Sequence, residues 1–474
     1  MDRSVEAATS DRLTDLVAEF SASCVFDDIP VDVMHLGKKS ILDGLGPALC
    51  GAKTEGPRML REYLSRSRAV AAGVPTATVF GCPDRLAVAD AALANGMAMH
   101  ADDYDDTMQA ATGKFQGIHP TAPVFSAVMA VAETGAYSGK ELLTAYHVGV
   151  EIACKLFDAT APEHILNGYH ATGTCGLLGA AVAVARLKGL DADTTRTALG
   201  IAASHSGGLQ ENFGTMTKPY HAGRSARDGI AAAELAEMGF TASQAILEAP
   251  RGFFMSHGGG WEAERIVDRI GAPWSFVDRG IWLKPWPTGS LSHPAMTLMR
   301  KFVVENDLKL EDVASIRLRT SENIHKTLLH HHPKTELEAK FSLEFVTAAL
   351  LVERDLGLAH FTDEFVRSSA VQRAVGLVDY ETFDEAHARA EGYTIVTSFV
   401  EIALNDERVL SGRLDYGKGS KANPMSDDEV EAKFRDCATF AGVDGERAEA
   451  ICQAIWQLED FPDARSLSRL LAYG

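Results

Sequence analysis

The segment at residues 174–187 constrains the fold more than any other part of the chain. It reads TCGLLGAAVAVARL and carries no charged residue before Arg186. A segment of this length and apolarity is typical of a buried helix, and its glycines and alanines let neighbouring helices approach closely. Other long helical segments lie at residues 29–50, 83–99, 119–134, 138–157, 191–206 and 219–237. Residues 1–274 are therefore predicted to form one large helical domain.

The pattern changes after Trp274, where residues 274–284 include two short segments that look extended. Residues 313–320 alternate apolar and polar side chains with a period of two, which is typical of a half-buried strand. Two further strands are predicted at residues 394–404 and 408–414. Helices are predicted at residues 294–305 and 338–353. Together these elements indicate a compact α+β insert.

The helical pattern resumes at Ser426, so the last helices are predicted to complete the first domain. The expected fold class is mainly α. It has a discontinuous all-helical domain of residues 1–274 and 416–474, interrupted by a smaller α+β lid domain of residues 275–415.

Charge and cysteine content exclude several classes of function. The formal net charge of −20 disfavours binding to nucleic acid or to anionic membranes. No segment approaches 18 uninterrupted apolar residues, and the charged N-terminus lacks the apolar core of a secretory signal. The seven scattered cysteines contain no C-x-x-C pair, so neither a zinc site nor a disulfide framework follows from them. A cytoplasmic protein without nucleic-acid or membrane partners is expected.

The acidic segment at residues 100–107 (HADDYDDT) is the first candidate site. Four carboxylates follow an apolar helical stretch directly. A solvated loop is one interpretation, but charges at the end of a buried helix need partners, which favours a functional loop. The segment also satisfies D-D-x-x-D, the Mg²⁺-diphosphate motif of all-helical isoprenoid synthases. That hypothesis leaves the α+β insert unexplained, and no second acidic motif follows downstream.

Three more segments combine glycine with basic side chains. Residues 168–174 (GYHATGT) open a buried helix, whose unpaired N–H groups could meet an anion. Residues 214–224 (GTMTKPYHAGR) place Lys218 before a helix-starting proline and predict a basic island for a carboxylate. Residues 284–294 (KPWPTGSLSHP) join a predicted strand to a helix at the domain junction. The triplet at 330–332 (HHH) is interpreted as surface, because consecutive histidines cannot easily point at one ion.

These motifs occur in the order found in the MmgE/PrpD family, which the sequence resembles from about residue 10 to its end. The family includes 2-methylcitrate dehydratase, cis-aconitate decarboxylase and iminodisuccinate epimerase. The resemblance implies a helical domain completed by C-terminal helices, a smaller lid domain, and a homodimer that uses no metal or organic cofactor. Around the acidic motif the sequence is nearer the decarboxylase and epimerase branches. The segment at residues 108–116 is longer than in the decarboxylases, so its substrate contacts are not transferred.

Carried over onto the matching positions, the resemblance implies a catalytic set and a substrate-binding set. The catalytic residues would be Asp103, Thr107, His119, His170, Lys218 and His293. The substrate-binding residues would be Lys284, His100 and His221.

The chemistry implied is formation of a carbanion or enediolate beside a carboxylate. Lys218 is expected to hold a substrate carboxylate, and His119 and His170 to move protons. Asp103 is expected to orient a histidine or keep it protonated, and His293 to complete the site from the lid. The sequence thus predicts a cofactor-free lyase, a dehydratase or decarboxylase, acting on a small di- or tricarboxylic acid.

Three alternatives remain open at this point. The first is an isomerase that resembles iminodisuccinate epimerase. The second is a Mg²⁺-dependent isoprenoid synthase. The third is a family member that has lost catalysis and serves as a binding protein.

Overall fold

The computed structural model describes residues 12–67, 73–109, 117–394 and 396–473. It separates into two compact units, which are described one at a time. Among the described residues, the larger unit contains the chain up to Ile281 and again from Ser426, and the smaller unit contains Trp282–Met425. The expected mainly α fold class is confirmed. Most of the segment at residues 108–116 and the N-terminal segment lie outside the described residues.

The larger unit is helical apart from two short antiparallel strand pairs. These pairs are β1 (Thr76–Thr78) with β2 (Arg85–Ala87), and β3 (Met108–Gln109) with β4 (Gly117–Ile118). The helices before the smaller unit are α2 (Leu13–Ser23), α3 (Val31–Gly51), α4 (Glu55–Ser67), α5 (Val88–His100), α6 (Thr121–Ala132), α7 (Gly139–Ala159), α8 (Glu163–Leu166), α9 (Ala171–Leu187), α10 (Ala192–His205), α11 (Thr217–Glu237) and α12 (Phe253–Gly258). The helices after it are α20 (Asp427–Phe440), α21 (Gly445–Trp456) and α22 (Arg465–Leu471).

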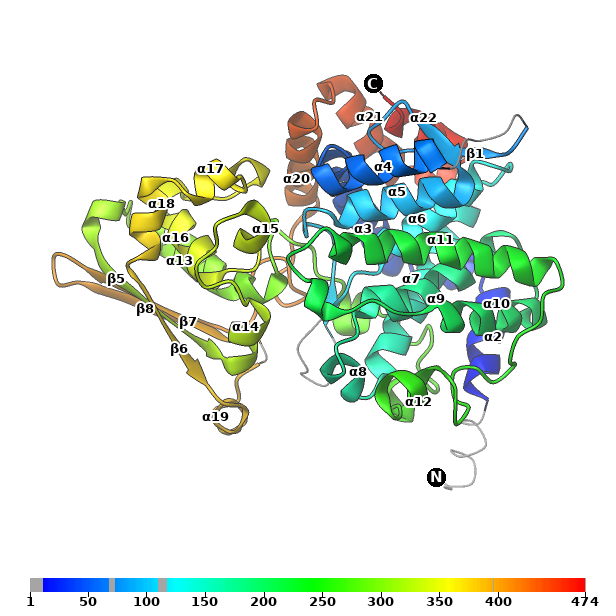
Figure 1. Cartoon of the computed structure of the whole chain (residues 1–474), viewed down its shortest axis with the longest axis horizontal. Coiled ribbons are helices and arrows are strands. Elements are labelled where there is room, and N and C mark those ends of the chain that lie inside the picture. Colours follow the sequence, from blue (N-terminus) through cyan, green and yellow to red (C-terminus); the bar gives the residue numbers. More distant parts are fainter. Residues whose placement is uncertain (1–11, 68–72, 110–116, 395, 474) are drawn as a thin grey trace. The chain divides into compact units, whose positions relative to one another are not determined.

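Small residues let the central helices pack closely, as the sequence predicts. Helices α7 and α9 meet at Gly179, where an added Cβ would lie 2.6 Å from the Ala153 Cβ. Helices α5 and α11 meet at Gly223, where an added Cβ would lie 2.1 Å from the Leu93 carbonyl oxygen. Side chains larger than hydrogen would force these helices apart, because a packed interior cannot absorb the extra volume. Figure 1 shows α5, α7, α9 and α11 within this unit.

The C-terminal helices α20, α21 and α22 belong to the larger unit, and α20 is bonded to its interior. The Lys433 side chain of α20 donates to the Asp43 carboxylate of α3 at 2.7 Å and to the Tyr104 carbonyl at 2.6 Å. All three residues are buried. The ion pair ties α20 to α3, and the hydrogen bond to Tyr104 ties it to the loop that follows α5 and carries the acidic segment.

One segment of the larger unit differs from its predicted structure. Residues 274–284 were expected to contain extended pieces, but Phe276–Gly280 forms a single π-helical turn. The buried Glu151 carboxylate accepts hydrogen bonds from the backbone N–H groups of Gly271 and Ser275, at 2.8 and 2.7 Å. These long-range bonds fix the turn at residues 271–275, which precedes the π-helical turn. The sequence of the segment itself does not predict them.

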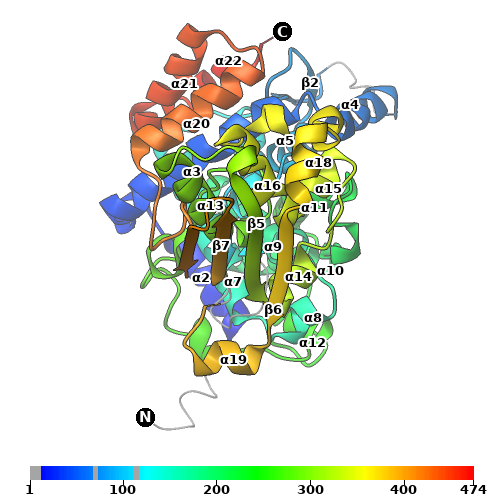
Figure 2. The same ribbon diagram turned by 90° about the vertical axis from the view of Figure 1, so that its left-hand side faces the viewer.

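The smaller unit is a four-stranded sheet covered by helices on one face. Its strands, in the order β6-β5-β7-β8, are Val378–Phe383, Val313–Ser321, Ser398–Leu404 and Val409–Leu414. The helices are α13 (His293–Glu305), α14 (Glu322–Thr327), α15 (Glu336–Ala339), α16 (Leu343–Glu353), α17 (Asp363–Val366), α18 (Ser369–Val375) and α19 (Glu385–Ala390). Figure 2 shows β7, β5 and β6 side by side, and α13 and α16 pack against the sheet.

The sheet is mixed rather than wholly antiparallel. Strand β5 pairs antiparallel with β7, and β7 with β8, as adjacent predicted strands would. Strand β6, which the sequence analysis does not predict, runs parallel to β5 with Ile316 opposite Val378. It is an edge strand with mostly half-buried or exposed side chains, so it lacks the apolar alternation that marks β5.

No helix in the described part of the chain is long and apolar enough to cross a membrane.

Candidate active site

The acidic segment is buried, not solvated. Helix α5 ends at His100, and Asp103 follows with φ of +50°, a left-handed conformation that aspartate tolerates better than most residues. The carboxylates of Asp102, Asp103, Asp105 and Asp106 are all at most 5% exposed. Because buried carboxylates need partners, each one indicates a specific contact. The solvated-loop interpretation is therefore wrong.

Asp103 forms a buried ion pair with Lys218. Lys218 lies in the first turn of α11, and its ammonium donates directly to the Asp103 carboxylate. The Phe213 ring lies against the same ammonium, 5.2 Å from its centroid. The expectation that Asp103 orients a histidine stays a prediction: its carboxylate pairs with the lysine, and one of its oxygens also lies within 4.8 Å of a ring nitrogen of His100 and of His119.

The carboxylate that holds histidines is Asp105, which the sequence analysis did not single out. Its side chain is fully buried, and its Oδ1 atom lies 2.8 Å from Nδ1 of His100. Its Oδ2 atom lies 3.7 Å from Nδ1 of His119. The two imidazole rings are 4.3 Å apart between centroids. Asp105 thus sits behind two neighbouring imidazoles and favours a hydrogen on the Nδ1 side of each.

His119 is held in one orientation by backbone groups. Its Nδ1 atom lies 2.8 Å from the Asp106 carbonyl oxygen, and its own backbone N–H donates to the Thr172 hydroxyl at 3.1 Å. A carbonyl accepts only, so Nδ1 carries the hydrogen of this contact. In a neutral ring, Nε2 is then the basic nitrogen.

His170 sits at the start of α9 and is kept neutral. It is 1% exposed, and burial, followed by the nearby Lys218 ammonium, lowers the imidazole pKa well below its ordinary value. Its Nδ1 atom lies 3.1 Å from Nδ1 of His221. Burial also lowers the pKa of His221 to about 4. Since one neutral ring must donate and the other accept, the tautomers of the two histidines are coupled: one ring carries its hydrogen on Nδ1 and the other on Nε2.

Nε2 of His170 is buried and has no hydrogen-bond partner among the described residues. The His170 ring lies 5.8 Å from that of His100 and 6.3 Å from that of His119, between centroids. The sequence-predicted residues Asp103, Lys218, His100, His119, His170 and His221 therefore form one buried cluster in the larger unit.

Asp106 belongs to a separate network below this cluster. Thr121 donates to its Oδ2 atom at 2.6 Å, and the Tyr146 hydroxyl lies 2.7 Å from the same threonine oxygen. Burial raises the pKa of the Asp106 carboxyl well above its ordinary value. Asp103 and Asp106 thus face different partners, so the D-D-x-x-D motif does not assemble a Mg²⁺ site here.

Thr107 lies beside the cluster in sequence and is 1% exposed. It precedes β3, and a Cβ added to Gly117 of the opposite strand would lie 2.1 Å from its hydroxyl oxygen. Glycine at position 117 therefore gives this hydroxyl its space.

The two remaining predicted residues, Lys284 and His293, belong to the smaller unit. They are 1% and 4% exposed and line a small pocket of this unit. No carboxylate is among the described residues that line it. The Thr288 hydroxyl lies 3.2 Å from Nε2 of His293. Two lysines and a histidine make this pocket basic in a strongly acidic chain.

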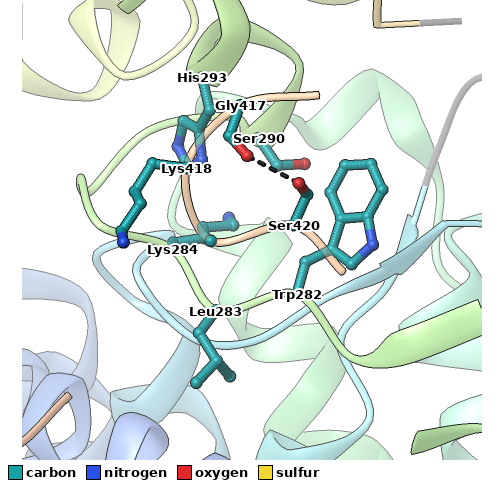
Figure 3. A pocket seen from close by; sticks show the side chains of 9 residues that line it. Trp282, Leu283, Lys284, Ser290, His293, Gly417, Lys418 and Ser420 are labelled. Carbon is teal, nitrogen blue, oxygen red and sulfur yellow. Dashed lines mark hydrogen bonds between the residues drawn. The ribbon is translucent and has the colours of Figure 1, made fainter. Parts of the chain in front are cut away.

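A turn at residues 417–420 also lines this pocket, and Figure 3 shows Gly417 and Lys418 beside His293. The Ser420 hydroxyl donates to the Gly417 carbonyl at 2.7 Å. Gly419 has φ of +88°, and an added Cβ would lie 1.8 Å from the Leu283 carbonyl oxygen. The sequence analysis did not predict this turn, although two glycines that flank Lys418 indicate a turn with a constrained backbone.

Comparison with known proteins covers almost the whole chain. Residues 15–266 match the model of the MmgE/PrpD N-terminal domain, and residues 286–458 match that of the MmgE/PrpD C-terminal domain. The chain is 28% identical to cis-aconitate decarboxylase of Homo sapiens, over 93% of this chain and 90% of that protein. It is 26% identical to cis-aconitate decarboxylase of Aspergillus terreus, over 99% of this chain and 98% of that protein.

Proposed function

The chain belongs to the MmgE/PrpD family, and from this premise we propose that it is a lyase acting on a small di- or tricarboxylic acid. The relatives in human and in Aspergillus terreus are decarboxylases of cis-aconitate, which makes decarboxylation the leading reaction. The observation that carries the proposal is the buried cluster of one lysine and four imidazoles at the end of α5 and at the starts of α6, α9 and α11.

The cluster suits chemistry that passes through a carbanion. In decarboxylation the bond between a substrate carbon and its carboxylate breaks, and the electron pair stays on the substrate as CO₂ leaves. In dehydration or epimerisation a proton leaves the carbon beside a carboxylate, and the electron pair of the broken C–H bond remains on that carbon. Each route needs a positive charge near the developing negative charge, in a site with little water. Lys218 supplies that charge while Asp103 holds its ammonium in place.

The imidazoles supply the proton transfers. His119 presents Nε2 as its basic nitrogen, because Nδ1 is committed to the Asp106 carbonyl. His170 is neutral and presents a buried Nε2 atom. A positioned imidazole of this kind contributes roughly 10²–10⁴-fold to the rate of a reaction that transfers a proton. We assign protonation of the product carbanion to this pair: an Nε2 atom takes up a proton from solvent, passes it to the substrate carbon, and leaves the ring neutral again.

Proton NMR in D₂O tests the proposal and identifies the reaction. The protein is incubated with cis-aconitate, methylcitrate, citrate and iminodisuccinate in separate samples. Loss of CO₂ with one deuteron in the product indicates a decarboxylase, and loss of water indicates a dehydratase. Deuterium uptake without a change of skeleton indicates an epimerase. A protein that turns over none of these substrates and exchanges no C–H proton contradicts the proposal and favours a binding role.

EDTA in a parallel sample separates this chemistry from metal-dependent alternatives. Turnover that survives EDTA is expected, because Lys218 and the imidazoles supply the charge and the protons. Turnover that EDTA abolishes and Mg²⁺ restores contradicts the proposed mechanism.

A further inference from the structure

We propose that the imidazole cluster of His100, His119 and His170 is also a binding site for a divalent transition-metal ion, with Zn²⁺ as an inhibitor. One ligand atom from each of these three buried residues lies within 4.8 Å of the other two. Imidazole nitrogen is a preferred ligand of Zn²⁺, Co²⁺ and Cu²⁺. The inhibition, though not the binding, rests on the proposed function.

The far side of each ring is braced in the way that metal-binding histidines are. Nδ1 of His100 faces the Asp105 carboxylate, and Nδ1 of His119 faces the Asp106 carbonyl. Nδ1 of His170 faces a second imidazole, that of His221. A carboxylate or carbonyl behind a ligating histidine fixes its tautomer and raises its basicity, and such partners change metal affinity by about 10–100-fold.

Nε2 of His170 gives an independent indication of a ligand. The atom is buried, its residue is 1% exposed, and it has no hydrogen-bond partner among the described residues. A buried polar atom without a partner costs free energy, which a bound ion would recover.

Local charge also favours a cation. The carboxylates of Asp103 and Asp105 outnumber the single ammonium of Lys218, so the cluster is negative when its imidazoles are neutral. The set His100, Asp103, Asp105 and His119 also converges within 4.8 Å and could add an oxygen ligand. An ion held by these nitrogens would occupy the lone pairs that the proposed proton transfers require, so turnover would stop.

Three buried cysteines compete poorly for zinc. Burial raises the pKa of the thiols of Cys24, Cys175 and Cys452, to about 11, 12 and 12. These thiols stay protonated at neutral pH, and a thiol ligates as the thiolate. The half-buried histidines His325 and His331 of the smaller unit are a rival nitrogen site. There His331 hydrogen-bonds to Glu344 at 2.7 Å and stacks on His325 at 4.0 Å.

Visible absorption of Co²⁺ added to the EDTA-treated and dialysed full-length protein tests the site directly. We expect one equivalent to give the intense bands of a nitrogen-ligated ion of low coordination number, and Zn²⁺ to abolish them. His170→Gln is expected to weaken Co²⁺ binding at least tenfold. Asp105→Asn, which keeps all three imidazoles, is expected to weaken it by about 10–100-fold. The matched control His331→Gln should bind Co²⁺ as the unaltered protein does.

Activity is measured in parallel on the carboxylate that the protein turns over. Polycarboxylates chelate Zn²⁺, so the enzyme is preincubated at a free Zn²⁺ concentration set by a metal buffer. Inhibition should follow the occupancy seen with Co²⁺, reverse with EDTA and be absent with Mg²⁺, which prefers oxygen ligands.

Two results would overturn the site: no Co²⁺ bands in the unaltered protein, or bands that persist unchanged in His170→Gln. Bands that depend on His170, in a protein that turns over no carboxylate, leave the metal site standing and refute the proposed function instead.

Discussion

Replacing Asp105 with asparagine tests the role that the structure gives to this carboxylate. The substitution keeps the size of the side chain but removes its charge and one of its acceptor oxygens. The His100 imidazole then loses a charge-assisted hydrogen bond at 2.8 Å, and His119 loses a carboxylate 3.7 Å from Nδ1. A hydrogen bond to a charged group is worth about 1.5–3 kcal/mol. At about 1.4 kcal/mol for each factor of ten, kcat/KM should fall roughly 10- to 150-fold.

The pH profile separates this role from a loss of folding. A carboxylate beside an imidazole favours its protonated form, so removing it should move the acid limb of kcat/KM to lower pH. Glu151→Gln is the matched control, because Glu151 is equally buried in the same unit and accepts two backbone hydrogen bonds away from the cluster. Asp105→Asn with kcat/KM within twofold of the unaltered enzyme and an unchanged pH profile would refute the reasoning.

Three further predictions concern the same unit. His170→Ala should reduce kcat at least a thousandfold while circular dichroism stays unchanged, since the proposed proton transfer loses its imidazole; near-normal kcat would remove His170 from the site. Gly223→Ala should lower the free energy of unfolding by about 1–3 kcal/mol, because the new Cβ has no room against Leu93. The control Gly445→Ala, with open space around it, should leave the free energy of unfolding nearly unchanged. Burial lowers the pKa of His147 from 6.5 to about 4. The unfolded chain therefore binds more protons between these values, and stability should fall by up to about 1.4 kcal/mol per pH unit below pH 6.5. Denaturation midpoints that do not change between pH 7 and pH 5 would contradict this.

The helices of the larger unit could be predicted because their pattern is local. Apolar length and small residues identify α9 without knowledge of its neighbours, and the Ser138–Glu141 capping box marks the start of α7 as the structure has it. Strand β6 could not be predicted, because its pairing with β5 is made across more than fifty residues and leaves little alternation in its sequence.

The site divides in the same way. The resemblance to the MmgE/PrpD family was enough to select Lys218, His119 and His170, which the structure gathers in one cluster. The partners of the carboxylates were not predictable, because they depend on the left-handed turn at Asp103 that directs successive side chains to different neighbours. Asp103 therefore meets Lys218, and Asp105 meets the histidines. Sequence order alone gives no reason to prefer one assignment over the other.

The most direct test of the central claim is the turnover of Lys218→Met on the carboxylate that the unaltered enzyme converts. Methionine keeps an unbranched side chain but removes the ammonium that is proposed to stabilise the carbanion. Substrate conversion and deuterium uptake are followed by proton NMR in D₂O, with the fold checked by circular dichroism. The account predicts a folded protein whose conversion and deuterium uptake both fall at least a thousandfold. A folded variant that retains a tenth or more of the activity would contradict it.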